Sequence, residues 1–184
     1  MVKPWKLTSS EMQLDCRVFK LRKDRVVNPR NGTSHEMFVL ENPDWVNVIP
    51  LTPDDQVVLV EQWRHGARSS QLETPGGLMD PHETPEECAR RELREETGYE
   101  AEDVILLGSV YPNPAIQANL QHYVLARDCR KVADLKLDHA EDIQVQLAPL
   151  ADIPFMIANS TIMHGIVIGG FYWLDLFRRG QLPR

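Results

Sequence analysis

The stretch 77–99 constrains the fold of this chain more than any other part of its sequence. Thr84, Pro85 and Glu87 predict the start of a helix. The Thr hydroxyl can cap a free amide, Pro suits the first turn, and Glu three residues later completes a capping box. Gly98 predicts the end of the helix, because glycine readily adopts the left-handed conformation that terminates helices.

Three carboxylates share one face of this predicted helix. Glu92, Glu95 and Glu96 lie at positions i, i+3 and i+4, where like charges repel by about 0.2–0.5 kcal/mol per pair. A divalent cation would turn that repulsion into a binding site, and Mg²⁺ suits a few carboxylates best, with Mn²⁺ as a possible substitute. The carbonyl of Gly76 is a further candidate ligand, because a glycine pair lets the backbone approach an ion. The alternative is a solvated acidic helix.

The spacing of these residues resembles the Nudix box of the Nudix hydrolases. The pattern is Gly, five residues, Glu, seven residues, then Arg-Glu-aliphatic-any-Glu-Glu-any-Gly-hydrophobic. The matching residues are Gly77, Glu83, Arg91, Glu92, Leu93, Glu95, Glu96, Gly98 and Tyr99. The resemblance implies a Mg²⁺-dependent pyrophosphatase in which Glu83 pairs with Arg91 and fixes the catalytic helix against its loop. An ordinary surface ion pair is the alternative for those two residues.

Composition narrows the possible partners and surroundings. A formal net charge of −7 provides no basic surface, so a nucleic acid polymer is not expected as a partner, whereas a nucleotide remains compatible through a bound metal. Cys16, Cys88 and Cys129 are too few and scattered for a disulfide framework. The N-terminus lacks the apolar core of a signal peptide, and no run has the length of a membrane span. We therefore expect a cytoplasmic protein without a membrane partner.

Residues 1–40 are predicted to form a small N-terminal β segment. Two short strands are expected at 16–21 and 25–27, joined by a charged turn at 22–24, with a further turn at Asn31-Gly32. So few strands are marginally stable alone. The arrangement resembles the ADP-ribose pyrophosphatase branch of the Nudix family, which implies a sheet exchanged or packed across a homodimer.

Residues 41–184 are predicted to form the hydrolase domain, with the pattern of a mixed sheet beginning at Met37. Periodicity alone indicates α/β or α+β, and the Nudix resemblance implies an α/β/α sandwich. Strands are expected at 37–40, 45–51, 57–63, 71–74, 104–111, 121–126 and 143–147, and further helices at 151–158 and 162–178. The last of these segments is apolar and contains glycines, which favours a buried or interface helix.

The segment 58–64 resembles the strand that supplies an arginine to the substrate diphosphate in this branch. The resemblance therefore assigns Arg64 to the diphosphate. Trp63 either stacks on a base or packs in the core. Arg68 either assists Arg64 or is a solvated loop charge.

Two further segments bear on the substrate. The sequence Glu73-Thr-Pro-Gly-Gly77 resembles the lead-in of ADP-ribose and sugar-nucleotide enzymes, and Pro114 lies where that group carries a marker proline. The segment 111–122 lacks the Pro-Gly followed by Ser/Thr and an acid that strict ADP-ribose enzymes often show. Its amides, among them Gln117 and Asn119, can hydrogen-bond sugar hydroxyls, which indicates broader substrates such as GDP-mannose.

The general base is expected in an acidic loop before a late strand. The segment 141–145 resembles the family's acidic-acidic-aliphatic-x-Val pattern, so Glu141 is the candidate, with Glu92 or Glu95 as alternatives. The sequence as a whole predicts hydrolysis of nucleoside diphosphate sugars such as ADP-ribose and GDP-mannose to a nucleoside monophosphate and a sugar phosphate. One alternative is a pyrophosphatase for oxidised nucleoside triphosphates. Another is a Nudix-fold regulator without turnover, against which the complete set of box carboxylates argues.

Overall fold

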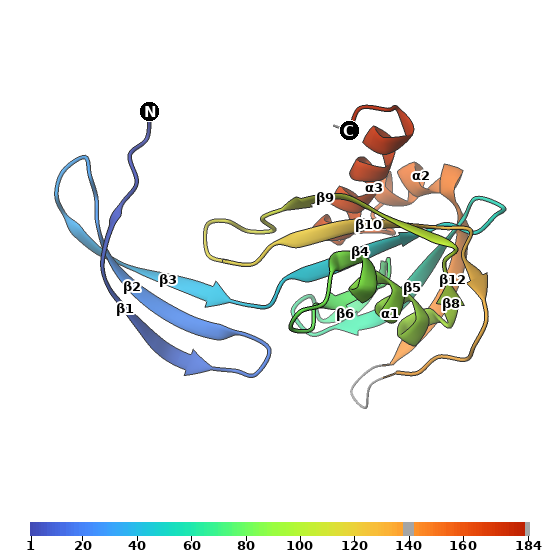
Figure 1. Cartoon of the computed structure of the whole chain (residues 1–184), viewed down its shortest axis with the longest axis horizontal. Coiled ribbons are helices and arrows are strands. Elements are labelled where there is room, and N and C mark those ends of the chain that lie inside the picture. Colours follow the sequence, from blue (N-terminus) through green and yellow to red (C-terminus); the bar gives the residue numbers. More distant parts are fainter. Residues whose placement is uncertain (138–141, 183–184) are drawn as a thin grey trace. The chain divides into compact units, whose positions relative to one another are not determined.

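The chain forms two compact units, and each is described by itself. The structure is a computed structural model that describes residues 1–137 and 142–182 (Figure 1). The first unit comprises Met1–Asp44 with Tyr111–Leu120, and the second comprises Trp45–Val110 with Gln121–Arg184. A domain boundary after residue 40 stays a prediction.

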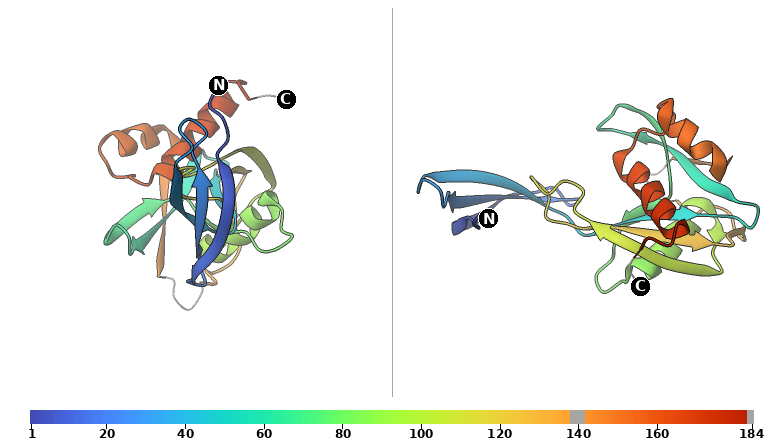
Figure 2. Two further views of the ribbon diagram at one scale, coloured as in Figure 1. Left: turned by 90° about the vertical axis from the view of Figure 1, so that its left-hand side faces the viewer. Right: turned by 90° about the horizontal axis from the view of Figure 1, so that it is seen from above.

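The first unit contains an antiparallel sheet with the strand order β1-β2-β3, drawn in blue in Figure 2. The strands are β1 (Lys6–Asp15), β2 (Lys20–Val27) and β3 (Ser34–Glu41). A single bridge between Leu40 and Gln117 joins the 111–120 loop to the end of β3. The predicted turn at Asn31-Gly32 connects β2 to β3, and Gly32 has a positive φ of 74°.

The prediction of two short strands around a charged turn at 22–24 is wrong. β2 runs through these residues because their charges find partners on neighbouring strands. Asp24 accepts hydrogen bonds from Ser10 of β1 and from Arg22, and Arg22 also pairs with Glu41 of β3. β1 has no counterpart among the predicted strands, because all its residues are exposed and it shows no apolar alternation. The mixed sheet does not begin at residue 37 either, since β3 pairs with β2.

The second unit is built on two larger sheets in its described residues. One has the order β7-β4-β10-β9 and is mixed, because β4 and β10 run parallel while the other pairs run antiparallel. The other has the order β12-β5-β6 and is antiparallel. The strands are β4 (Trp45–Pro50), β5 (Gln56–Arg64), β6 (Ser69–Glu73), β7 (Gly76–Leu78), β9 (Asp103–Val110), β10 (Gln121–Arg127) and β12 (Ile143–Pro149), with β8 (Tyr99–Glu100) pairing β11 (Arg130–Lys131).

Helices cover both faces of β4 and β10, as Figure 1 shows for α1 in green and α3 in red. The helices are α1 (Pro85–Thr97), α2 (Ile153–Ala158) and α3 (Gly165–Arg178), with the 3₁₀ turn η1 (Leu150–Asp152) before α2. Alternate residues of β4 point to opposite faces. Val46 and Val48 pack with Leu93 of α1, whereas Ile49 packs with Phe171 of α3. The predicted α/β/α sandwich with a mixed sheet is thus confirmed.

The apolar segment predicted as a buried or interface helix forms α3, which begins at Gly165 rather than Ile162. Val167, Phe171 and Leu174 contribute to the core. Within the residues that the structure describes, no helix has the length and apolar character needed to cross a membrane.

Candidate active site

The acidic helix α1 begins and ends where the sequence predicts. The Thr84 hydroxyl accepts the backbone N–H of Glu87, and the Glu87 carboxylate accepts the backbone N–H of Thr84, so the capping box is complete. Gly98 ends the helix with a φ of 72° and donates its N–H to the carbonyl of Arg94. These two caps set where the three carboxylates of the helix project.

Arg91 joins the helix to the loop that precedes it. Its guanidinium donates to both carboxylate oxygens of Glu83, at 2.9 Å each, and to the carbonyl of Leu78 at 3.1 Å. The hydrogen bonds with Arg91 hold the pKa of the Glu83 carboxyl below its usual range. A two-pronged pair of this kind fixes orientation as well as charge.

The three carboxylates of α1 lie in different surroundings. Glu92 and Glu96 are buried, with 9% and 4% of their surface exposed, whereas the side chain of Glu95 is 36% exposed. Glu92 accepts a hydrogen bond from Arg91 at 2.7 Å, and Glu95 lies 3.4 Å from the same nitrogen. Glu96 instead accepts the backbone N–H of Gly76 at 3.1 Å. Two of the carboxylates are therefore held close together by one guanidinium, and the third by the glycine loop.

The glycine pair leaves no room for side chains beside these carboxylates. A Cβ on Gly77 would lie 2.2 Å from Oε1 of Glu92, and a Cβ on Gly76 would lie 2.2 Å from the carbonyl oxygen of Val46. Carboxylate and carbonyl oxygens are the ligands that Mg²⁺ prefers, so the donor types and the open backbone fit a hard divalent cation. Among the described residues, however, no group of three His, Cys, Asp or Glu side chains has converged as in a formed metal site.

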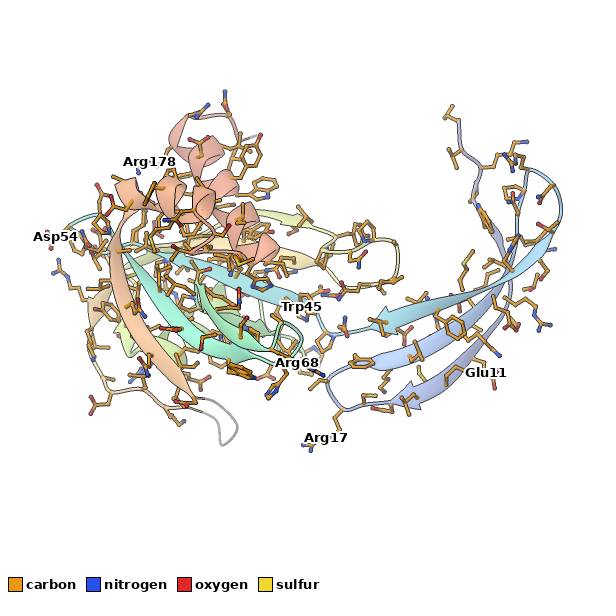
Figure 3. The ribbon with its side chains drawn as sticks, turned by 180° about the vertical axis from the view of Figure 1, so that it is seen from behind. Glu11, Arg17, Trp45, Asp54, Arg68 and Arg178 are labelled. Atoms are coloured by element: carbon orange, nitrogen blue, oxygen red, sulfur yellow. The ribbon has the colours of Figure 1, made fainter. Side chains whose placement is uncertain are left out.

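A cavity of about 810 Å³ is lined in part by the glycine pair. This volume is in the range of small-molecule sites. Its walls include Gly76, Gly77 and Arg64, and also the apolar side chains of Trp45 and Ile166. Figure 3 shows Trp45 at the start of β4 and Arg68 in the turn between β5 and β6. The glycine pair thus borders both the cavity and the carboxylates of Glu92 and Glu96.

One buried carboxylate organises the polar part of the cavity wall. Glu73, at the end of β6, is 2% exposed and accepts two hydrogen bonds from Arg64, at 2.9 and 2.6 Å. Nδ1 of His164, the residue before α3, lies 3.3 Å from the same carboxylate. Burial alone would raise the pKa of Glu73, but Arg64 and then His164 outweigh it and lower that pKa to about 2.

Comparison with known proteins places this site in a family. The model of the NUDIX domain matches residues 42–164. The chain belongs to the Nudix family. Together with relatives named ADP-ribose pyrophosphatase and ADP compounds hydrolase, the match shows that the chain is a Nudix hydrolase, and these hydrolases generally use divalent metal ions such as Mg²⁺. The regulator alternative is therefore not retained.

Several relatives of this Nudix hydrolase have curated names. A methanol dehydrogenase activator of Bacillus methanolicus is 35% identical over 126 residues, which cover 68% of each chain. An ADP-ribose pyrophosphatase of Bacillus subtilis is 28% identical over 172 residues, covering 93% of this chain and 92% of the relative. A GDP-mannose pyrophosphatase of Citrobacter koseri is 38% identical over 117 residues, covering 59% of this chain and 61% of the relative.

A solved structure confirms the fold over nearly the whole length. The crystal structure of an ADP compounds hydrolase superposes with a TM-score of 0.86 and covers 99% of both chains at 22% sequence identity. Together with the family match and the pyrophosphatase relatives, this likeness agrees with the predicted ADP-ribose pyrophosphatase branch.

The structure of this Nudix hydrolase brings some predicted substrate residues to the cavity and not others. Arg64 lies in the cavity wall. Trp63 is 54% exposed, which does not agree with the core-packing alternative, and neither Trp63 nor Arg68 is among the residues that line the cavity. Pro114, Gln117 and Asn119 belong to the first unit, and Glu141 lies outside the described residues, so their assigned roles stay predictions.

Two residues of the cavity wall, Glu73 and His164, have no role predicted from the sequence. Glu73 stands in the lead-in motif, and its position at the end of a strand before a Pro-Gly-Gly loop was a usable signal. His164 gives no such signal in the sequence, because a single His before an apolar helix is common in ordinary loops. Its place beside Glu73 depends on how α3 packs across β4.

Proposed function

We propose that this Nudix hydrolase cleaves the pyrophosphate bond of nucleoside diphosphate sugars, with Mg²⁺, to a nucleoside monophosphate and a sugar phosphate. The observation that carries the proposal is the glycine pair 76–77, which lines the 810 Å³ cavity and also contacts the carboxylates of Glu92 and Glu96. A diphosphate beside this pair would have room for an end group in the cavity and acidic ligands for its counter-ion.

Different residues of the chain would hold the metal ion and bind the diphosphate. Glu92, Glu95 and Glu96, with the carbonyl of Gly76, would hold Mg²⁺ or Mn²⁺. Such an ion supplies positive charge that offsets the diphosphate and acidifies the attacking water. Arg64 would bind the diphosphate from the cavity wall through its guanidinium.

The remaining residues hold the catalytic helix and move the proton. Glu83 and Arg91 keep α1 fixed against its loop. Glu141 would take the proton of the water that attacks phosphorus, while the P–O bond to the departing phosphate breaks. In Glu141→Gln we expect hydrolysis at neutral pH to fall by about 100-fold or more. A near-normal rate would transfer the role to Glu92 or Glu95.

The relatives support the choice of substrate. Proteins named ADP-ribose pyrophosphatase and GDP-mannose pyrophosphatase are both similar to this chain. A nucleoside diphosphate sugar has a nucleoside or sugar group at each end of its diphosphate, and a cavity of this size can hold such a group.

A substrate panel tests the proposal directly. Phosphate release would be measured for ADP-ribose, GDP-mannose, UDP-glucose, diadenosine polyphosphates and oxidised dGTP, with a coupled phosphatase, in Mg²⁺ and again with a chelator. We expect turnover of several nucleotide sugars that chelator abolishes. Turnover of triphosphates alone would contradict the proposed substrate class, and equal turnover with chelator would contradict the metal requirement.

A further inference from the structure

Glu73 occupies an unusual position for a charged residue. Its side chain is 2% exposed, yet it lies in the wall of the cavity rather than within either apolar core cluster. Removing a carboxylate from water is costly unless charged hydrogen bonds compensate. Here the compensation comes from two parallel N–H donors of Arg64, at 2.9 and 2.6 Å. The pair is thus formed from one buried partner and one partner that faces the cavity.

The geometry of this pair restricts Arg64. Arg64 is the last residue of β5, where an unpaired arginine side chain would sample many rotamers. The two-pronged contact fixes the plane of its guanidinium, although 43% of the side chain is exposed. A fixed guanidinium loses less conformational entropy when an anion binds. The pair therefore prepares Arg64 for a ligand in the cavity.

His164 approaches the same carboxylate from a different element. It is the N-cap residue of α3, with extended backbone, and its side chain makes no capping hydrogen bond. Nδ1 lies 3.3 Å from Oε2 of Glu73, within ion-pair distance although not in hydrogen-bonding geometry, and the ring lines the cavity. The carboxylate of Glu73 is thus shared by one side chain from β5 and one from the loop before α3.

We propose that Glu73 is a positioning residue for substrate binding, which holds Arg64 and His164 in the cavity wall so that both contact the anionic part of the substrate. The proposal rests on the proposed function for the identity of that substrate, a nucleoside diphosphate sugar. Glu73 itself acts through the two side chains that it orients. His164 then becomes a second substrate contact, on the α3 side of the cavity.

Kinetics of Glu73→Gln test the proposal. With ADP-ribose and Mg²⁺, we expect KM to rise about tenfold while kcat changes less than threefold, because a neutral amide cannot accept both N–H groups of Arg64. Asp103→Asn is the matched control, since Asp103 pairs with Arg127 on β9 and β10 away from the cavity lining. A loss of kcat with unchanged KM would show a structural role only and would overturn the proposal.

A comparison of combined variants separates positioning from an independent effect. If Glu73 acts through Arg64 and His164, adding Glu73→Gln to the double variant Arg64→Ala/His164→Asn should not weaken ADP-ribose binding further. Fully additive losses would contradict this. His164→Asn places a favourable N-cap residue at the start of α3, so it should fold normally and raise KM by about threefold to tenfold. An unchanged KM in His164→Asn would contradict the proposed contact between His164 and the substrate. If Glu73→Gln does not fold, the same result would overturn the whole proposal.

A binding measurement distinguishes failure of this inference from failure of the proposed function. Calorimetric titration of ADP-ribose in chelator reports binding without turnover. Weaker binding by Glu73→Gln than by the wild-type chain supports positioning even if no substrate of the panel is hydrolysed. Equal binding by both proteins, or none by the wild-type chain, overturns the positioning role. Melting curves of each variant would accompany the titrations.

Discussion

The α-carbon of Gly77 lies against the carboxylate of Glu92, so closely that a Cβ on Gly77 would be 2.2 Å from Oε1. This contact explains physically why the loop before α1 carries a glycine at that position. Any other side chain would have to displace Glu92 from the face that it shares with Glu95. The conformation of the loop and the direction of one candidate metal ligand are therefore set together.

Gly77→Ala should impair hydrolysis much more than stability. The added methyl group must push the end of the Glu92 side chain aside, which is a flexible group, so we expect unfolding free energy to fall by only about 1–2 kcal/mol. Activity should fall at least tenfold, because displacing a metal ligand by about 1 Å slows catalysis strongly. Urea denaturation and kcat with ADP-ribose would measure the two effects. Activity within twofold of wild type would show that Glu92 can move without consequence.

Glu92→Gln and Glu96→Gln test the metal assignment. An amide retains one acceptor oxygen but loses the charge that attracts a divalent cation, so we expect at least a hundredfold loss of Mg²⁺-dependent hydrolysis and weaker Mn²⁺ binding. Isothermal titration with Mn²⁺ would follow binding independently of turnover. The exposed Glu102 provides a control of the same chemistry, Glu102→Gln, outside α1. Unchanged hydrolysis in both site variants would make the metal assignment wrong.

Arg91→Lys should destabilise the protein although it retains the positive charge. A lysine cannot reproduce the two-pronged bond to Glu83 together with the contacts to Glu92 and the Leu78 carbonyl. We expect a loss of roughly 1–3 kcal/mol in unfolding free energy, since partly buried acceptors are left unsatisfied. Glu83→Gln should cost less, because it keeps one acceptor. Denaturant titration at neutral pH would rank the two, and an equal or reversed order would contradict the two-pronged role.

Stability should decline in acid through Glu73. Its pKa in the folded state is about 2, below the ordinary value of 4.5, so the ionised form is favoured by folding. The contribution is fully present above about pH 4.5 and is lost as the pH falls toward 2, with a total on the order of 2–3 kcal/mol. Chemical denaturation of wild type and Glu73→Gln from pH 6 to pH 2 would reveal it as a difference in slope. Parallel curves would rule out this linkage.

We expect a homodimer in solution, as the resemblance of the N-terminal segment implies. The sheet of β1, β2 and β3 leaves Leu7, Leu14 and Phe38 more than half exposed, and a sheet of so few strands is marginally stable unless its apolar side chains are covered. Light scattering on the purified chain would give the mass, and Phe38→Glu should shift it toward monomer. A monomeric wild-type chain would contradict the expected exchange or packing of this sheet between copies.

The acidic helix α1 was predictable from interactions between residues that are close in sequence. The caps at Thr84 and Gly98 and the i, i+3, i+4 spacing act within one helix, so the bounds of α1 and the shared face of its carboxylates follow from sequence neighbours. The buried strands β4, β5 and β10 were predictable for a similar reason, since they are apolar runs bounded by turns.

The first sheet was not predictable in the same way. Charged residues 22–24 look like a turn in sequence, and they form a strand because Ser10 and Glu41, on neighbouring strands, supply partners for them. Pairing between strands that are far apart in sequence decides such cases, and it leaves little trace in local pattern.

The family and the acidic helix were predictable from the residues of one short segment, because the caps and the spacing of the box residues are local, and the Arg91–Glu83 pair was expected from the resemblance to that family. The meeting of Arg64 and His164 at the Glu73 carboxylate, and the contact of the glycine pair with both the cavity and the carboxylates of Glu92 and Glu96, follow from the tertiary structure. These groups come from β5, β6, β7, α1 and the loop before α3. Their meeting depends on burial of the apolar faces of two sheets and two helices, which brings distant segments together without regard to their order in the chain.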